Sequence, residues 1–591
     1  MVAERVPVAL SRVVFVVAVA LGMLVWSVLA TAPAGAHAML ESTTPTGGQV
    51  LDTPPDALTL SFSEGVEVSL GAVRVYDGSG ERLDAVEAEH PDGEGTEVRV
   101  DLGDLADGSY VVTWRVTSAD SHPIQGAFTF QVGPDATAAD VSSLVDRLLS
   151  EQGGEPSVGL VYGADRFLVF ASIALLLGGL FFVAVISPPS RSRPTTRRLL
   201  WAAWVTCLGA TVAGIGLQGA YAAGLDLTDA FRSSLFEEVL DTRFGQVSVL
   251  RVALLVAIAP VVARLVARGP RAEHSIPSWW LPVAAVVGVG LAATPGIGGH
   301  AGAGDLVALA LVADTVHVGA MSLWVGGLAY LAFAALPRRE VDEVRSAVTR
   351  FSRLAVICVV TIVATGTFQG WRQVRSIEAL RETDYGQILI VKIVVVAVII
   401  VAAAFTREVV YRLYHRPARV AARVGAGDDS GDPTDLDAEQ FALDAPRELR
   451  RLRGSVAVEV AIAVVVLAVT ALLVNTNPAK DEVEGPYLAT VEADQLAFDV
   501  TVTPAARGLN DLHLFALTPS GGPSDVIEMT ATMSLPAEEI APIEVPLTRL
   551  GPGHYTTSGF NVPIAGDWVL ELSALVSPTD EVTAETTVPI R

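Results

Sequence analysis

The stretch that sets the fold class of this 591-residue chain reads Asp305-Leu-Val-Ala-Leu-Ala-Leu-Val-Ala-Asp314-Thr-Val-His317-Val-Gly-Ala-Met321-Ser-Leu-Trp324-Val-Gly-Gly327. Its length and apolar composition predict a membrane-spanning helix over residues 305–336. Four side chains share one helix face through a 3-4-3 spacing, and these are Asp314, His317, Met321 and Trp324. At a rise of ~1.5 Å per residue, His317 lies about 18 Å inside the outer end. Ionisable groups at that depth are costly and usually face a functional interior.

Two interpretations of this helix are open. In the first, Asp314, His317 and Met321 line a pathway through the membrane, and His300 at the external mouth is an entry ligand. In the second, Asp314 and His317 only satisfy each other between packed helices, where nearby glycines allow close contact.

The rest of the chain extends the membrane assignment. With 51% hydrophobic residues, it is too apolar and too long for one soluble domain. Both cysteines, Cys207 and Cys358, lie inside predicted spans, so a disulfide framework is not available. Besides residues 305–336, seven further spans are predicted near residues 166–188, 199–222, 246–268, 279–299, 352–371, 387–410 and 455–474.

The charges between the spans predict the orientation. Four connections carry 21 Lys and Arg residues in total, whereas the three connections on the other side carry five. The positive-inside rule then places the charged connections in the cytoplasm and both terminal domains on the external side. We therefore expect a multi-pass protein of the cytoplasmic (plasma) membrane, with the lipid bilayer as a partner.

Three further charged residues lie in or near the spans. Glu459, about one turn into the last span, is a candidate for proton coupling, although a salt bridge with Arg453 or Lys392 explains it equally well. Arg251 and Lys392 are placed near span ends, where snorkelling of the long side chain explains them.

Residues 1–36 have the features of a secretory signal peptide. Arg5 and Arg12 supply the positive charge, residues 13–30 the apolar region, and Ala34-Gly-Ala36 the small-residue cleavage pattern. Cleavage after Ala36 makes His37 the first residue of the mature chain. An N-terminal His offers an amine nitrogen with a pKa near 8 and an imidazole nitrogen to one metal ion.

Residues 37–135 predict an all-β Greek-key sandwich or barrel. Apolar residues alternate in short runs between turn signals such as Asp77-Gly and Asp107-Gly. The last predicted hairpin reads Trp114-Arg-Val-Thr-Ser-Ala-Asp120-Ser-His122-Pro-Ile-Gln-Gly. We expect Asp120 and His122 in the loop between its strands, with both side chains pointing outward.

This segment resembles the periplasmic copper-binding CopC family in its cleavage site, its Trp-containing strand and its Asp-x-His hairpin. The resemblance implies Cu(II) bound by the amine and imidazole of His37, by Asp120 and by the imidazole of His122. Nitrogen and carboxylate donors suit Cu(II). Because the mature chain is poor in methionine, we expect one Cu(II) site and no second Cu(I) site in this domain.

A linker over residues 136–163, with a short amphipathic segment over 141–149, precedes the predicted eight-helix bundle of residues 164–476. The bundle resembles the CopD family in its His317-x6-Trp324-x-Gly-Gly pattern, in Phe351-Ser-Arg-Leu-Ala and in the final helix with Glu459. That family is associated with copper movement across the cytoplasmic membrane. The sequence has no Gly-x4-Gly-Lys-Ser/Thr motif, so a gradient or the membrane potential would drive transport.

Residues 479–591 predict an external immunoglobulin-like β-sandwich, because short runs with apolar residues at every second position recur between glycine-containing turns. The segment is similar to the YtkA-like domain that follows CopC and CopD in YcnJ-type copper proteins. Its candidate metal donors are His513, His554, Met529 and Met533, although donors without close spacing are usually surface or core residues.

These features together predict a copper protein that captures Cu(II) outside the cell and passes it to the bundle for import. The alternatives are external sequestration giving resistance, and delivery to an oxidase by unidentified donor or acceptor proteins. A membrane redox protein with b-type haem is a third alternative, but only His317 lies deep in a span. The two external domains are strongly acidic, with 18 acidic against 4 basic residues in 37–135, which excludes nucleic acid as a partner. We find no catalytic triad or paired carboxylates and expect a non-enzyme.

Overall fold

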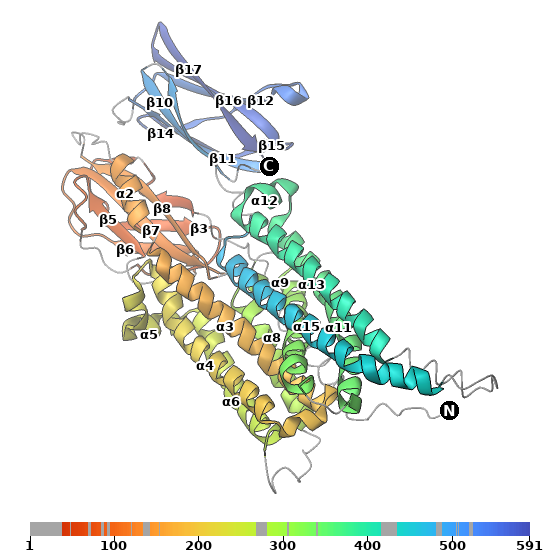
Figure 1. Cartoon of the computed structure of the whole chain (residues 1–591). Helices are drawn as coiled ribbons and strands as arrows, with labels where there is room; N and C mark the ends of the chain where they lie inside the picture. The colour runs from red at the N-terminus through yellow and green to blue at the C-terminus, as the bar shows by residue number, and fades with distance from the viewer. Residues whose placement is uncertain are drawn as a thin grey trace. The chain divides into compact units, whose positions relative to one another are not determined.

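The computed structural model describes residues 38–590 apart from 39, 48, 69–71, 84–87, 92–94, 120, 134–141, 153, 268–279, 304–305, 338–340, 415–433, 480–486, 494, 504, 506 and 519–523. By their contacts, the residues divide into two compact units, one built mainly from the long helices and one from the β-rich segments (Figure 1).

The N-terminal domain is a β-sandwich, as predicted. One sheet has the order β1-β3-β6, and the other has the order β2-β8-β7-β4, with β5 also paired to β7. The strands are β1 (Leu40–Thr44), β2 (Gln49–Leu51), β3 (Ala57–Phe62), β4 (Val66–Glu67), β5 (Val73–Asp77), β6 (Glu97–Asp101), β7 (Gly108–Ser118) and β8 (Pro123–Val132). Alternate residues of β3 are buried, as expected for a strand with one face on the core.

Strand β7 is buried on both faces. Trp114 belongs to the sandwich core, whereas Val111 on the opposite face packs against Leu144 and Leu148 of helix α2 (Ser142–Gln152). The amphipathic segment that the sequence placed in a linker is therefore the helix that covers this strand.

The membrane part contains, within the described residues, eight helices long and apolar enough to cross a bilayer, as predicted. They are α3 (Pro156–Phe181), α4 (Pro194–Ala223), α6 (Arg243–Leu265), α8 (Trp280–Ile297), α9 (Val307–Met321), α11 (Val341–Val374), α13 (Asp384–Tyr414) and α15 (Thr434–Asn475). Between them lie the short helices η2 (Pro188–Ser192), η3 (Leu227–Phe231), α5 (Ser233–Asp241), η4 (His300–Gly302) and α12 (Ile377–Glu382). Helix α3 begins inside the predicted linker.

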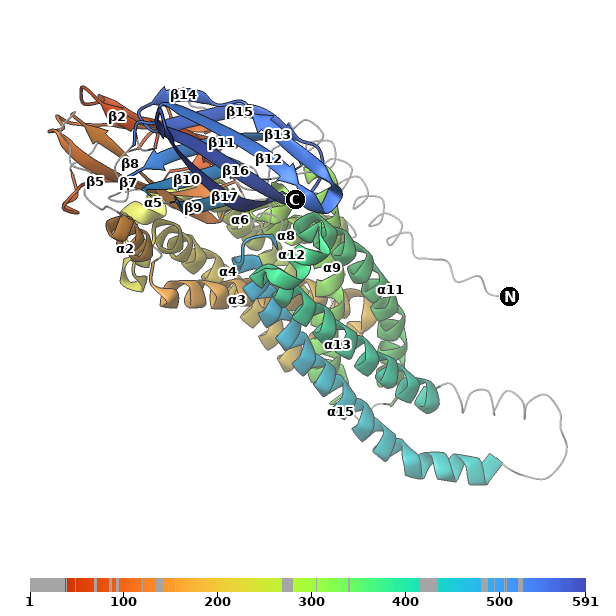
Figure 2. The ribbon, with the colours of Figure 1, turned by 90° about the horizontal axis from the view of Figure 1, so that it is seen from above.

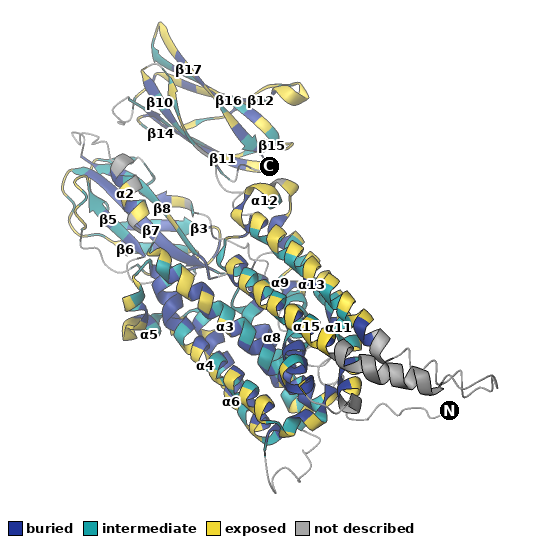
Figure 3. Ribbon diagram, in the orientation of Figure 1, coloured by how far each residue is buried: buried dark blue, intermediate teal, exposed yellow. Residues whose placement is uncertain are grey.

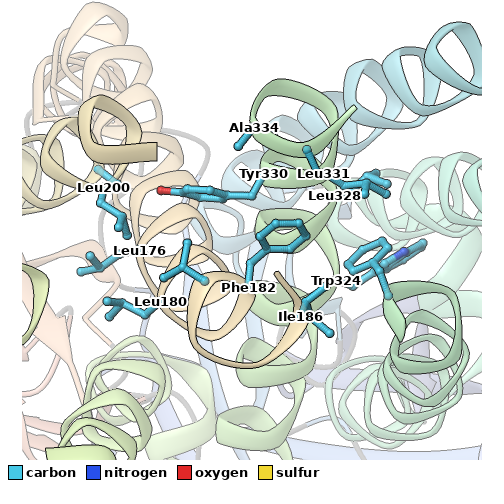
Figure 4. Close-up of a cluster of buried hydrophobic side chains, with 14 of the residues drawn as sticks. Leu176, Leu180, Phe182, Ile186, Leu200, Trp324, Leu328, Tyr330, Leu331 and Ala334 are labelled. Carbon is cyan, nitrogen blue, oxygen red and sulfur yellow. The ribbon is translucent and has the colours of Figure 1, made fainter. Parts of the chain in front are cut away.

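Two of the spans end in wider helical turns. Helix α3 continues as the π-helical turn η1 (Phe182–Ile186), and α9 continues through η5 (Ser322–Gly326), α10 (Gly327–Tyr330) and η6 (Leu331–Ala335). A π-helical turn holds more residues than an α-helical one. The prediction that Trp324 shares a helix face with His317 assumes α-helical spacing, and that spacing ends at Met321. Trp324 packs into the bundle core near Ile186 (Figure 4).

The first and fifth spans approach each other at two glycines. A Cβ atom on Gly326 would lie 2.0 Å from the carbonyl oxygen of Ala174, and one on Gly178 would lie 2.3 Å from that of Ser322. Small residues permit this close backbone approach between membrane helices.

The outer helices present apolar side chains at their surface. Ile357 on α11 and Val401 on α13 are exposed, and many further residues on the described parts of α13 and α15 are exposed as well (Figure 3). Apolar surface of this extent fits contact with lipid rather than water.

The C-terminal domain has two antiparallel sheets around one core, in the orders β14-β15-β11-β10-β9 and β13-β12-β16-β17 (Figure 2). The strands are β9 (Tyr487–Ala493), β10 (Leu496–Thr503), β11 (Gly508–Leu517), β12 (Glu528–Leu535), β13 (Ile540–Val545), β14 (Thr548–Gly551), β15 (His554–Val562), β16 (Gly566–Ser577) and β17 (Asp580–Ile590). Trp568 is the largest fully buried side chain, and its indole nitrogen donates to the carbonyl oxygen of Ile564 at 3.0 Å.

Candidate metal centres

The hairpin of β7 and β8 carries His122 at its turn. The amide of Ser118 donates to the carbonyl of His122, and the amide of Ser121, at a φ of 72°, donates to the carbonyl of Ser118, each at 2.9 Å. The side chain of His122 is only 1% exposed. The expectation that it points outward is therefore wrong. The other predicted Cu(II) ligands, His37 and Asp120, lie outside the described residues.

The chain enters the sandwich at the end that carries this turn. Strand β1 begins with Leu40 opposite Phe62, the last residue of β3. Four residues later, Val66 pairs with Ser118, where the turn begins. The first described strand therefore begins at the same end of the domain as the turn that carries His122.

A buried carboxylate lies at this end and was not singled out in the sequence. Glu64 follows β3 and is 6% exposed. It continues the inward-facing series of Leu58, Leu60 and Phe62. Glu64 lies two residues after Phe62, at the next inward-facing position of the alternating pattern. A carboxylate at such a position was the signal that could have identified it.

Close packing fixes the hairpin next to the turn. The Trp114 indole covers Gly126, where a Cβ atom would lie 2.6 Å from the ring, and Phe62 contacts Trp114 edge-on with ring centres 5.4 Å apart. Strand β3, which ends opposite Leu40, and the hairpin that carries His122 therefore share one aromatic contact.

In the bundle, His317 of α9 contacts α11. Its Nδ1 lies 2.9 Å from the hydroxyl oxygen of Thr365, and that hydroxyl donates to the carbonyl of Thr361 at 2.7 Å. The short bond from this hydroxyl to Thr361 favours Nδ1–H of His317 as the donor to Thr365. The second nitrogen, Nε2, then keeps its lone pair, which is the form a metal ion requires.

Asp314, one turn before His317, has a different set of neighbours. Its side chain hydrogen-bonds with Gln369 of α11 and interacts electrostatically with Lys392 of α13 and with Arg372. Asp314 and His317 thus each have a hydrogen-bond partner on α11. Lys392 acts on both Asp314 and His317, a role that the snorkelling interpretation missed.

A second buried charged group lies in the first half of the bundle. Arg251 of α6 is buried, and its Nε donates to the hydroxyl oxygen of Thr294 on α8 at 2.9 Å. It also interacts electrostatically with Asp165 of α3, which is buried as well. Arg251 therefore does not snorkel, and Asp165 is a buried carboxylate that the sequence analysis did not consider.

The remaining predicted pathway residues are spread over the bundle. Met321 is partly buried against the core, and His300 begins the short helix η4. Glu459 is buried and accepts a hydrogen bond from Thr406, whereas Arg453 donates to the carbonyl of Leu336. Within the described residues, Glu459 is thus bonded to a hydroxyl group rather than to Arg453 or Lys392.

The C-terminal domain separates its four candidate donors. Met529 and Met533 are buried in the core, on β12. His513 of β11 and His554 of β15 lie together instead, with ring centres 5.9 Å apart. Burial lowers the pKa of His554 to about 4, with a contribution from His513. Burial also lowers the pKa of His513, which Asp511 opposes. Both rings are therefore neutral near pH 7.

Among the described residues, no group of three or more His, Cys, Asp or Glu side chains is arranged to hold a metal ion. Cys207 and Cys358 are free and buried in the bundle.

Three family models match successive parts of the chain. The CopC domain matches residues 40–133, the N-terminal domain of copper resistance protein D-like proteins matches residues 157–308, and copper resistance protein D matches residues 345–473.

Curated relatives agree with these matches. Copper transport protein CutJ of Bacillus subtilis is 27% identical over 365 residues, which cover 60% of this chain and 65% of CutJ, a little under two thirds of that relative. Copper resistance protein C of Pseudomonas syringae pv. tomato is 35% identical over 129 residues, covering 21% of this chain and 98% of that protein. The crystal structure of CopC from Methylosinus trichosporium OB3b is 30% identical and covers 17% of this chain and 98% of that chain, with a TM-score of 0.16. The chain therefore belongs to the CopC–CopD copper-resistance family and carries both modules in one polypeptide.

Proposed function

We propose that this protein captures Cu(II) outside the cell at the turn end of its N-terminal sandwich and passes copper to the membrane bundle for import. The observation that carries the proposal is the convergence at this end of the chain entry, the buried imidazole of His122 and the buried carboxylate of Glu64. The family membership and the name of the relative CutJ support copper as the cargo.

In the capture step, the amine and imidazole of His37, the carboxylate of Asp120 and the imidazole of His122 bind the ion. Nitrogen and carboxylate donors favour Cu(II) over most divalent metals. Glu64 supplies further negative charge from inside the domain. The protein's role is binding and transfer rather than catalysis.

In the transfer step, His317 is the central ligand, because its hydrogen bond to Thr365 leaves Nε2 available. His300 and Met321 serve as the outer and inner neighbours along the path, and Asp314 provides negative charge one turn away. Glu459 takes part in coupling copper movement to a proton gradient. The charge distribution between the spans supports an external position for both terminal domains.

Copper accumulation in cells tests this proposal. The double variant Asp120→Ala/His122→Ala and the single variant His317→Ala are each expected to reduce copper accumulation severalfold at low external copper. His90→Ala is the matched control, because His90 lies in the same N-terminal domain and its Nδ1 hydrogen-bonds to the carbonyl of Glu97. Normal accumulation with His317→Ala would instead favour external sequestration, and normal accumulation with both variants contradicts the proposal.

A further inference from the structure

The two histidines of the C-terminal domain lie on one surface of the β11–β15 pair. Leu512, Leu514 and Tyr555 of these strands are buried in the domain core. His513 and His554 alternate with them and therefore lie on the opposite face. In the register Phe515 is directly opposite His554, so His513 is its diagonal neighbour.

The pair is held in place by an aromatic contact. Phe515 stacks on the ring of His554, with ring centres 4.1 Å apart and planes 17° apart. This contact fixes the ring plane of His554 while leaving both ring nitrogens at the edge. His513 is separated from His554 by 5.9 Å between ring centres. With metal–nitrogen bonds of about 2.0 Å, two imidazoles that share one ion have ring centres roughly 6 Å apart.

One nitrogen of His554 lacks a hydrogen bond to the part of the chain that the structure describes. The side chain is 4% exposed, and its Nε2 is buried with no hydrogen-bond partner among the described residues. Leaving such a buried polar group unsatisfied destabilises the folded protein. Stacking on Phe515 explains the position of the ring but does not satisfy this nitrogen. A bound cation would satisfy it through the lone pair.

We propose that His513 and His554 form a second copper site, which binds Cu(I) through two imidazole nitrogens on the outer face of β11 and β15. The choice of copper as the ion rests on the proposed function, whereas the pairing of the two rings does not. Among the described residues no third His, Cys, Asp or Glu side chain completes a metal site here. Two donors suffice for Cu(I), which accepts linear two-coordination, whereas zinc and Cu(II) require more ligands.

The site is tested on the full-length protein in detergent by anaerobic titration with Cu(I) against a chromogenic Cu(I) chelator. Each of the variants His513→Asn and His554→Asn is expected to bind one Cu(I) ion fewer per protein, or to bind that ion with a dissociation constant at least tenfold higher. His90→Asn is the matched control and retains the equivalent. Unchanged Cu(I) binding in both C-terminal variants overturns the proposal, as does preferential binding of Zn(II) at this pair.

A second variant separates ligation from folding. His513→Cys offers a thiolate, a ligand that Cu(I) prefers, and is expected to keep the Cu(I) equivalent with one sulfur neighbour in the X-ray absorption spectrum. Loss of binding in both His513→Asn and His513→Cys would show a structural role and overturn the site. The variant His122→Ala is expected to lose the Cu(II) signal of the N-terminal site and to keep the Cu(I) equivalent. This result would show that the C-terminal site binds copper independently of the N-terminal site.

Discussion

A single hydroxyl group lies against His317 inside the membrane. Because the Thr365 hydroxyl bonds to the carbonyl of Thr361 on its own helix, we assign Nδ1–H of His317 as the donor to Thr365, which leaves Nε2 for a ligand. Groups that orient a ligating histidine in this way contribute strongly to metal affinity. The importance of Thr365 follows from the pairing of two helices and was not visible in the sequence around either residue.

We expect Thr365→Val, which keeps the shape of the side chain but removes the acceptor, to weaken copper binding at His317 by about tenfold. Copper accumulation at limiting external copper should fall accordingly. Thr367→Val is the matched control, because Thr367 on the same helix is exposed and bonds only to the carbonyl of Val363. Equal accumulation in the two variants would show that Thr365 does not orient His317.

The positions of His317 and His122 within their elements could be predicted from the sequence, but the groups that surround them could not. The depth of His317 followed from the rise of a helix, and the turn position of His122 followed from strand alternation. Lys392 and Arg251 were interpreted as snorkelling side chains, yet Lys392 acts on Asp314 and Arg251 is buried against Thr294. A partner on another helix is a tertiary property, and helical periodicity of one segment carries no information about it.

At the scale of elements, the contact between the first and fifth spans depends on residues without side chains. Gly326 lies in the π-helical turn that follows α9, directly against the backbone of α3 at Ala174. This contact holds the helix that carries His317 against its neighbour.

We expect Gly326→Ala to destabilise the bundle by about 1–3 kcal/mol, because the added methyl group overlaps the carbonyl of Ala174. The measurement is the thermal unfolding midpoint of the purified protein in detergent. Gly319→Ala is the matched control on the same span, since nothing lies within 4 Å of its Cβ position. Identical midpoints for the two variants would contradict the close contact.

Most elements could be predicted, because each spans a long segment of uniform pattern. All eight membrane spans are present near their predicted positions. The exceptions are local changes of geometry. The π-helical turn at Ser322 interrupts the 3.6-residue period, and helix α2 is part of the N-terminal domain rather than a linker because Leu144 and Leu148 cover Val111.

At the scale of the whole molecule, three modules follow one another along the chain: an N-terminal β-sandwich, a helical bundle and a C-terminal β domain. Their order could be predicted from composition and alternation alone. The likeness of the C-terminal domain to YtkA-like domains stays a prediction, since the family matches end at residue 473. The proximity of His513 and His554 could not be predicted, because 40 residues and three strands separate them in the sequence.

We propose that the mature chain begins with a copper ligand, His37, and Cu(II) electron paramagnetic resonance can detect that ligand. The protein used is residues 37–152, which contain the complete sandwich core and helix α2. It is compared with the same protein carrying one additional N-terminal residue. We expect a nitrogen-rich tetragonal signal that the added residue destroys and that His122→Ala also weakens. Identical weak binding by the native and extended forms would show that His37 is incidental and would contradict capture at this end of the domain.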